Sequence, residues 1–151
     1  MENLINGKIP FVFNGLEGQE APKKHSKEAA GLDLFSTLEY PLVINPGDTK
    51  KITTGLSVAI PNGYVGLVFA RSSLGFKFQC TLTNGVGVID SDYFATGNTI
   101  KIALFNIGYE EITIKKGEAI AQGIFHSVNI GDDVVTTERI GGFGSTDLKE
   151  G

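Results

Sequence analysis

Apolar residues occur in short runs that are rich in β-branched and aromatic side chains, and turn-forming residues separate the runs. Asn45-Pro46-Gly47-Asp48 and Pro61-Asn62-Gly63 are strong turn sequences between two such runs. Breaks recur about every 8–12 residues, which is typical of a β-sandwich or barrel. The runs predict strands at 11–13, 42–44, 56–60, 64–70, 76–82, 86–89, 99–105, 111–114 and 119–128.

Helical patterns are weak. Residues 26–30 and 72–77 could each form a turn, but neither segment supports a stable helix alone. The 151 residues, with 20 glycines and five prolines, fit one domain with many turns. The prediction is an all-β, jelly-roll-like fold with little helix.

Charge and composition exclude several classes of partner. The formal net charge is −4 and like charges form no long run, so we expect no nucleic-acid partner. No apolar run approaches the ~18 residues of a membrane-spanning helix, and the N-terminus lacks a signal-peptide pattern. Cys80 is the single cysteine, so no internal disulfide can form. We expect a cytoplasmic protein, in the host cytoplasm if it is viral.

The segment 70–75, Ala-Arg-Ser-Ser-Leu-Gly, ends an apolar run with an arginine and two hydroxyls. If a helical turn begins there, Arg71, Ser72, Ser73 and backbone N–H groups could bind an anion. The alternative is an ordinary strand end with a serine cap.

The segment 84–93 contains Asn84-Gly85 between two strand-like runs, which favours a hairpin or tight bend. Its glycines would let a ligand approach the backbone. Asp90 follows an apolar run, so we expect it at a strand end and partly buried. The alternative is a plain hairpin with an aspartate in the turn.

Three further segments carry candidate polar groups. Asp33 lies inside a hydrophobic strand and needs a positive partner or a role near a metal. Gln122 follows a turn and is expected to point inward. The glycine-rich segment 141–146 combines Phe143 with hydroxyls that could contact a flat base and phosphates. The alternative for that segment is an unstructured tail.

Five motifs in order, AAGLDLFS, ARSSLG, NGVGVIDSDY, KKGEAIAQ and GGFGSTD, make the chain resemble the trimeric dUTPase family over about residues 25–147. The resemblance implies a distorted jelly-roll β domain at 1–138 and a C-terminal arm at 139–151. It also implies a homotrimer with shared active sites, over which the arm closes. The implied reaction is hydrolysis of dUTP to dUMP and pyrophosphate with Mg²⁺.

The resemblance also assigns roles to residues. Asp90 would orient the water that attacks the α-phosphorus, and Tyr93 would exclude a ribose 2′-hydroxyl. Asp33 would act in the outer shell of Mg²⁺. The expected phosphate contacts are Arg71, Ser72, Ser73, Gln122, Arg139, Ser145 and Thr146. The expected contacts to the nucleoside are Asn84, Gly87, Val88, Ile89 and Phe143. Lys101 and Gly144 are further residues expected to bind the substrate.

Several positions depart from the family pattern. The loop at 94–99 is about three residues longer than usual and lacks the customary Arg-Gly. Ala119 replaces a frequent arginine, Asp147 replaces a glycine, and Arg139 lies one residue closer to the glycine pair. These departures put the loop geometry and the phosphate contact of Arg139 in question.

Two alternatives stay open. A dCTP deaminase of the same superfamily would need a glutamate where Ala103 stands. A non-enzymatic regulatory protein is favoured only by the longer loop.

Overall fold

The computed structural model describes residues 3–129 and residue 131. Short strands make up most of this part of the chain, with one α-helix, α1 (Ser72–Phe78), and one 3₁₀ helix, η1 (Tyr93–Thr96). The strands are β1 (Asn3–Ile5), β2 (Ile9–Phe13), β3 (Leu32–Phe35), β4 (Leu42–Ile44), β5 (Thr49–Thr53), β6 (Leu56–Val58), β7 (Tyr64–Phe69), β8 (Cys80–Leu82), β9 (Gly87–Ile89), β10 (Lys101–Asn106), β11 (Ile112–Ile114) and β12 (Ala119–Ser127).

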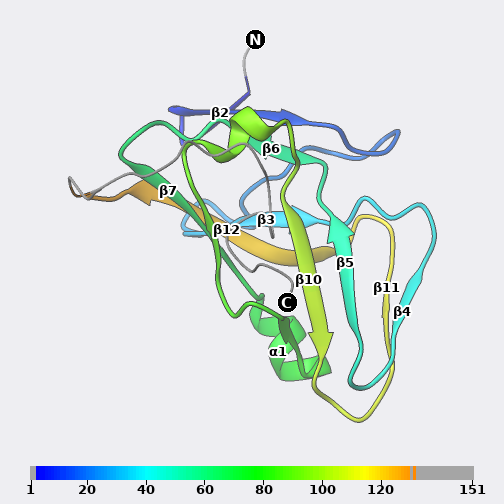
Figure 1. Cartoon of the computed structure of the whole chain (residues 1–151). Coiled ribbons are helices and arrows are strands. Elements are labelled where there is room, and N and C mark those ends of the chain that lie inside the picture. Colours follow the sequence, from blue (N-terminus) through cyan, green and yellow to red (C-terminus); the bar gives the residue numbers. More distant parts are fainter. Residues whose placement is uncertain (1–2, 130, 132–151) are drawn as a thin grey trace.

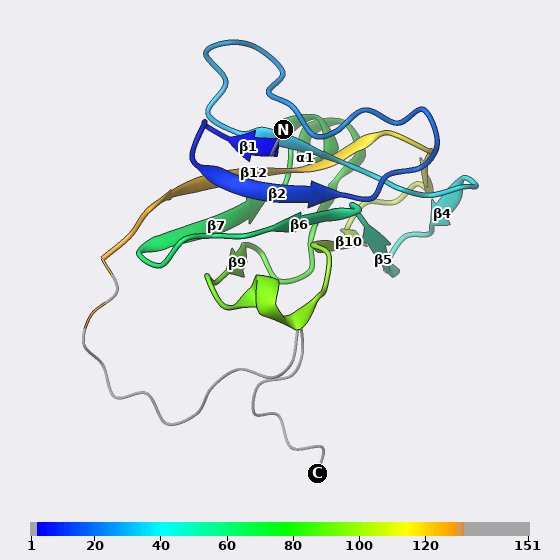
Figure 2. The same cartoon turned by 90° about the horizontal axis from the view of Figure 1, so that it is seen from above.

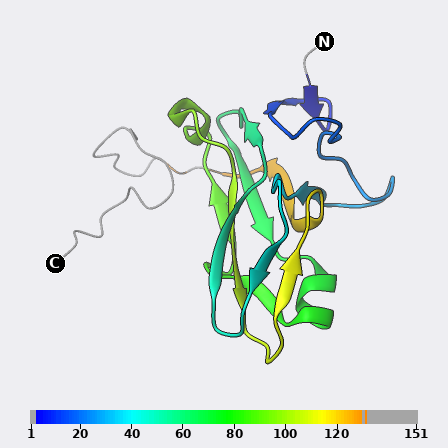
Figure 3. The same ribbon diagram turned by 90° about the vertical axis from the view of Figure 1, so that its right-hand side faces the viewer.

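The strands form antiparallel sheets in the orders β3-β12-β7-β9, β5-β10-β8, β1-β2-β6 and β11-β4. In Figure 1 β10 and β5 run across β12, which belongs to the other layer, and Figure 3 shows the two layers from the side. Figure 2 shows β1, β2 and β6 along one edge of these layers. The predicted all-β, jelly-roll-like fold is confirmed.

Alternating burial creates the core between the layers. In β10, Ile102, Leu104 and Asn106 point inward, whereas the intervening side chains point outward. Val68 of β7 and Leu34 of β3 are also buried. Each fully buried aliphatic side chain of this kind contributes roughly 1.5–3 kcal/mol of transfer free energy. The two-residue period of the sequence therefore fixes which side chains face the core.

The predicted strand at 76–82 is wrong in its first half. Helix α1 continues through Phe78, and Gln79 then takes a left-handed conformation, with φ 49°, before β8 starts. The Gln79 N–H caps the helix on carbonyl oxygens of Leu74 and Gly75. Within α1 only Leu74 is buried, so the remaining apolar residues resembled a strand although they face outward.

The segment around Asn84 is a bend between two sheets. β8 pairs with β10 and β9 pairs with β7, so the structure has the tight bend and not the hairpin, the two forms that the sequence allowed. Gly85 has φ 73°, and its N–H donates to the Leu82 carbonyl over 3.0 Å. The bend therefore needs glycine at position 85 and carries the chain from one layer to the other.

Two strands, β1 and β5, were absent from the sequence prediction. In β5 only Ile52 of five residues is buried, so its apolar pattern is too sparse to indicate a strand. Among the described helices, neither is long and apolar enough to cross a membrane.

Candidate functional site

Arg71 pairs with Asp33 where β7 meets α1. Arg71 Nε lies 3.1 Å from Asp33 Oδ1, and both side chains are largely shielded from solvent. Asp33 comes from the middle of β3, and Arg71 is the residue that precedes α1. The ion pair supplies the positive partner that a carboxylate in an apolar strand requires. It also orients the guanidinium at the start of the helix.

Gln122 supports the same turn from the neighbouring strand. In the sheet, β12 places Gln122 opposite both Asp33 of β3 and Phe69 of β7. Gln122 Nε2 donates to the Ala70 carbonyl over 3.1 Å. A Cβ atom on Gly31 would lie 2.6 Å from Gln122 Oε1, so the missing side chain at Gly31 makes room for the amide. Gly31 was not among the site residues predicted from the sequence, although it belongs to the first motif.

Ser72 and Ser73 open α1 directly after this turn. Ser72 is exposed and Ser73 is half-buried, and neither side chain caps the helix. The structure thus places Arg71, Ser72, Ser73 and Gln122 near the end of β7, and their binding of an anion stays a prediction. Cationic, hydroxyl and amide donors together can bind phosphate oxygens.

A second group of predicted residues lies between β9 and β10. Asn84, Gly87, Ile89 and Lys101 line a cavity of about 20 Å³. A Cβ atom on Gly87 would approach Val68 Cβ to 3.1 Å and Asn84 Nδ2 to 3.8 Å. The glycine therefore keeps this side of the bend open beside the Asn84 amide. A cavity of this size has room for about one water molecule.

Val88 and Asp90 face solvent in the single chain. Val88 points away from the core between buried Gly87 and Ile89. Asp90 follows β9 directly, as predicted, but it is exposed. The expected partial burial is therefore wrong for the isolated chain.

Tyr93 is almost completely buried, at 2% exposure. Its hydroxyl donates to the Thr99 carbonyl over 2.9 Å. Thr96 Oγ1 donates to the Tyr93 carbonyl over 2.7 Å, and Ser57 Oγ donates to the Asn98 carbonyl over 3.1 Å. The longer loop after Tyr93 is thus a folded segment that holds the ring in place.

Asp90 and Arg71 lie toward opposite ends of β7. Ile89 pairs with Gly66, which brings Asp90 level with Val65, whereas Arg71 follows the far end of the strand. Six residues at about 3.3 Å each separate Val65 and Arg71 by about 20 Å. One chain therefore separates its predicted base from its predicted phosphate-binding arginine.

The predicted arm residues Arg139, Phe143, Gly144, Ser145 and Thr146 lie outside the described residues. Their contacts, and the boundary at residue 138, stay predictions.

A family model described as dUTPase matches residues 18–147. The chain belongs to the dUTPase family. The chain is 43% identical to a deoxyuridine 5′-triphosphate nucleotidohydrolase of Desulfitobacterium hafniense (strain DSM 10664 / DCB-2), over 95% of this chain and 97% of that protein. It is 36% identical to the enzyme of the same name from Ehrlichia canis (strain Jake), over 98% and 100% of the two chains.

Solved structures of dUTPases have the same fold. The dUTPase from Streptococcus mutans matches with a TM-score of 0.71 and 28% identity, over 83% of this chain and 98% of that chain. The Staphylococcus bacteriophage 80alpha dUTPase matches with a TM-score of 0.73 at 22% identity, over 88% and 98% of the two chains, which bears on the fold alone. The predicted membership of the dUTPase family is confirmed.

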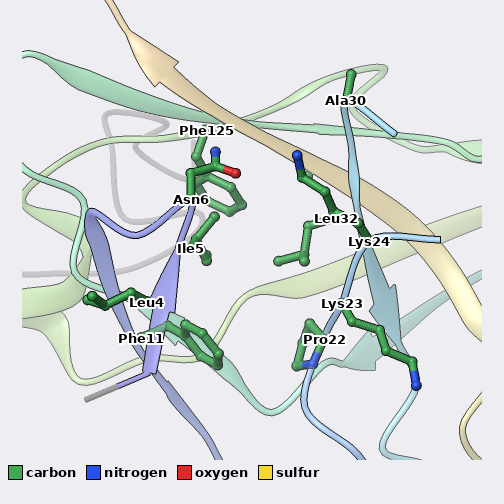
Figure 4. Close-up of a pocket in the computed structure, with 11 residues that line it drawn as sticks. Leu4, Ile5, Asn6, Phe11, Pro22, Lys23, Lys24, Ala30, Leu32 and Phe125 are labelled. Carbon is green, nitrogen blue, oxygen red and sulfur yellow. The ribbon is translucent and has the colours of Figure 1, made fainter. Parts of the chain in front are cut away.

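A separate cavity of about 230 Å³ lies where the β1–β2 hairpin meets β3 and β12. Figure 4 shows Ile5, Phe11, Leu32 and Phe125 around it, with Lys24 nearby. None of the predicted site residues lines this cavity, so it is distinct from both groups described above.

Proposed function

We propose that the protein hydrolyses dUTP to dUMP and pyrophosphate in active sites shared between identical chains. The observation that supports the proposal most directly is the separation of Asp90 from Arg71 along β7. A carboxylate that takes a proton from the attacking water must lie within about 3 Å of that water. Because about 20 Å of β7 separates the two groups, a single chain does not bring both to one nucleotide. A neighbouring copy can.

The attacking water would be oriented by Asp90 of one chain. The carboxylate accepts the water proton as the oxygen bonds to the α-phosphorus, and pyrophosphate leaves on the opposite side. Arg71 and the Ser72 and Ser73 hydroxyls of another chain would balance the charge of the phosphates. The Asp33–Arg71 contact supports this role, because it holds the guanidinium at the start of α1.

Nucleoside recognition would take place at the bend between β8 and β9. The Asn84 amide and the backbone at Gly87, Val88 and Ile89 would bind the uracil edge. A site built to hydrogen-bond its ligand rejects analogues that lack those groups by as much as about 10⁴-fold. Lys101 lines the same cavity, and the buried Tyr93 would restrict the space beside the sugar.

Mg²⁺ would enter with the triphosphate. Within residues 3–129 and 131, no three acidic, histidine or cysteine side chains gather into a metal site. Mg²⁺ commonly binds through substrate phosphates and one or two carboxylates. Asp33 is the acidic side chain beside Arg71 and would act in the outer shell. The ion would neutralise charge on the phosphates.

A homotrimer would cover an apolar face of the β3-β12-β7-β9 sheet. The pairing aligns Val88, Leu67 and Ile124 across three neighbouring strands. Val88 and Val86 are exposed in the single chain, and Leu67 and Ile124 are only half-buried. Burial of this row against a neighbouring copy would bring the two halves of each site together. The arm at 139–151 would then close over the nucleotide.

Two competing functions have different requirements. A deaminase would need a proton shuttle in the cavity beside Asn84. The described residues that line this cavity include Ala103 and no carboxylate. A regulatory protein would need no turnover.

A turnover assay with dUTP and Mg²⁺ separates the three functions. The proposal predicts release of dUMP and pyrophosphate. Ammonia release from dCTP would indicate a deaminase, and nucleotide binding without pyrophosphate release would indicate a regulatory protein.

A further inference from the structure

The C-terminal end of α1 and the turn from β10 to β11 lie at the same end of the molecule (Figures 1 and 3). An aromatic groove lies between them. We use this name for the groove of about 320 Å³ bounded by Phe76, Phe78, Tyr109 and Ile112. Phe76 is 90% exposed, Tyr109 is 93% exposed and Phe78 is 50% exposed. Exposed aromatic side chains that gather around one groove are a feature of binding surfaces.

The wall of the groove that carries Tyr109 is held by a fully buried asparagine. Asn106 Nδ2 donates to the Ile44 carbonyl over 2.9 Å and to the Glu110 carbonyl over 2.7 Å. Its Oδ1 accepts from the Gly108 N–H over 2.9 Å. All the side-chain hydrogen-bonding groups of Asn106 thus fix the backbone on both sides of Tyr109, which therefore projects from an ordered turn.

The helix end is tied to the same turn. The Ile107 N–H donates to the Gln79 carbonyl over 3.0 Å. A Cβ atom on Gly108 would lie 2.8 Å from Gln79 Oε1 and 3.1 Å from Gln79 Cβ, so the two segments touch closely. The backbone that supports the groove is therefore pre-organised, which lowers the entropic cost of binding a partner.

The charged side chains around the groove favour a cationic partner. Glu110 and Glu111 line one side and are exposed, and Lys77 lies on the helix side. Within the described part of the chain, neither carboxylate takes part in an ion pair. Two acidic groups beside aromatic rings favour a cationic side chain, because ring faces also attract cations.

We propose that the aromatic groove binds a segment of another protein in which an arginine or lysine neighbours apolar side chains. The apolar side chains would pack against Phe76, Phe78 and Tyr109, and the cation would lie at Glu110 and Glu111. The groove is formed at the C-terminal end of α1, whereas Arg71 precedes its first residue. Binding there would leave the proposed catalytic groups accessible.

Peptide display on the full-length protein tests this proposal. Random peptides would be selected on the natural chain and counter-selected on the Phe76→Ser/Tyr109→Ser variant. We expect enriched peptides that contain arginine or lysine beside apolar residues. Calorimetry should then give affinities at least about tenfold weaker for the double variant, equivalent to about 1.4 kcal/mol. The variant Glu110→Gln/Glu111→Gln should weaken binding and reduce its dependence on salt.

Tyr40→Ser is the matched control. Tyr40 is a 77% exposed aromatic residue that lies outside the groove, because it precedes the end of β4 that pairs with Ile114, whereas Ile112 lies at the other end of the β4–β11 pair. It should leave peptide binding unchanged, and all variants should hydrolyse dUTP like the natural chain. The proposal is wrong if no selected peptide depends on the groove, or if the enriched peptides are acidic. It is also wrong if the double variant changes the number of subunits, which would make the groove a subunit contact. Binding to lipid vesicles of neutral composition, with no peptide binding, would equally overturn it.

Discussion

Gln122 Nε2 donates a hydrogen bond to the Ala70 carbonyl over 3.1 Å, and this bond joins the middle of β12 to the residue before Arg71. The amide has its place because Gly31 has no side chain. Three motifs that lie far apart in the sequence thus meet at one turn. The contact indicates that Gln122 positions the phosphate-binding segment in addition to any contact with phosphate.

Gly31→Ala should lower kcat/KM for dUTP by roughly 2- to 10-fold while the chain stays folded. The new methyl group would displace the end of the Gln122 side chain and break its bond to Ala70, and loss of one hydrogen bond costs roughly 0.5–1.5 kcal/mol. Steady-state kinetics and thermal unfolding would measure the two effects.

Gly75→Ala is the matched control, because a Cβ atom there meets no other atom within 4 Å. It should stabilise α1 slightly, by up to about 1 kcal/mol, since alanine is the better helix former. Equal losses of activity in the two variants would argue against the role given to Gln122.

Arg71→Ala should reduce both stability and activity. It would leave the Asp33 carboxylate without its partner in a largely buried position, and a buried charge that loses its partner typically costs about 3 kcal/mol or more. Chemical denaturation would measure this loss. In the Arg71→Ala/Asp33→Asn double variant, stability should recover and activity should not. Recovery of both would mean that Arg71 has only a structural role.

Asp90→Asn should retain nucleotide binding and lose turnover by orders of magnitude. The amide keeps the size of the side chain but cannot accept the proton of the attacking water. Calorimetric titration with dUTP and steady-state assays would separate binding from catalysis. Asp92→Asn, two residues along the same loop, is the control and should be far less affected. Near-normal turnover by Asp90→Asn would refute its assignment as the base.

Tyr93→Phe should weaken discrimination between dUTP and UTP. The change removes the hydroxyl that donates to Thr99 and so loosens the loop that holds the ring. Stability should fall by about 1 kcal/mol, which corresponds to one hydrogen bond. The ratio of kcat/KM for the two nucleotides measures the effect on specificity. An unchanged ratio together with lower stability would show that the hydroxyl contributes to stability and not to specificity.

The fold class could be predicted from the spacing of apolar runs and turns, because burial on one face of a strand imposes a two-residue period. β5 could not be found in this way, since Ile52 is its single buried residue. The extent of α1 was missed because Phe76 and Phe78 are apolar yet exposed. Aromatic rings are usually expected in the core, and only the three-dimensional structure shows that these two face solvent.

The candidate site was predictable only in part. The order of the motifs indicated Arg71, Asn84 and Asp90 as candidates. It did not indicate that Arg71 and Asp90 lie toward opposite ends of β7, which depends on the pairing of β7 with β9. Partial burial of Asp90 was expected from the apolar run before it, yet a strand end that faces outward leaves it exposed. The partner of Asp33 required knowledge that β3 and β7 both flank β12.

The sharing of each site between chains is tested most directly by mixing two inactive variants. Asp90→Asn and Arg71→Ala would each be purified, mixed, unfolded together and refolded, alongside each variant refolded alone. Random assembly should restore about a quarter of the natural turnover, because one site in about four would join an intact Asp90 to an intact Arg71 from neighbouring chains of a closed ring. If the mixture contains mixed trimers and still has no activity above the separate variants, the two groups do not act together across a subunit boundary.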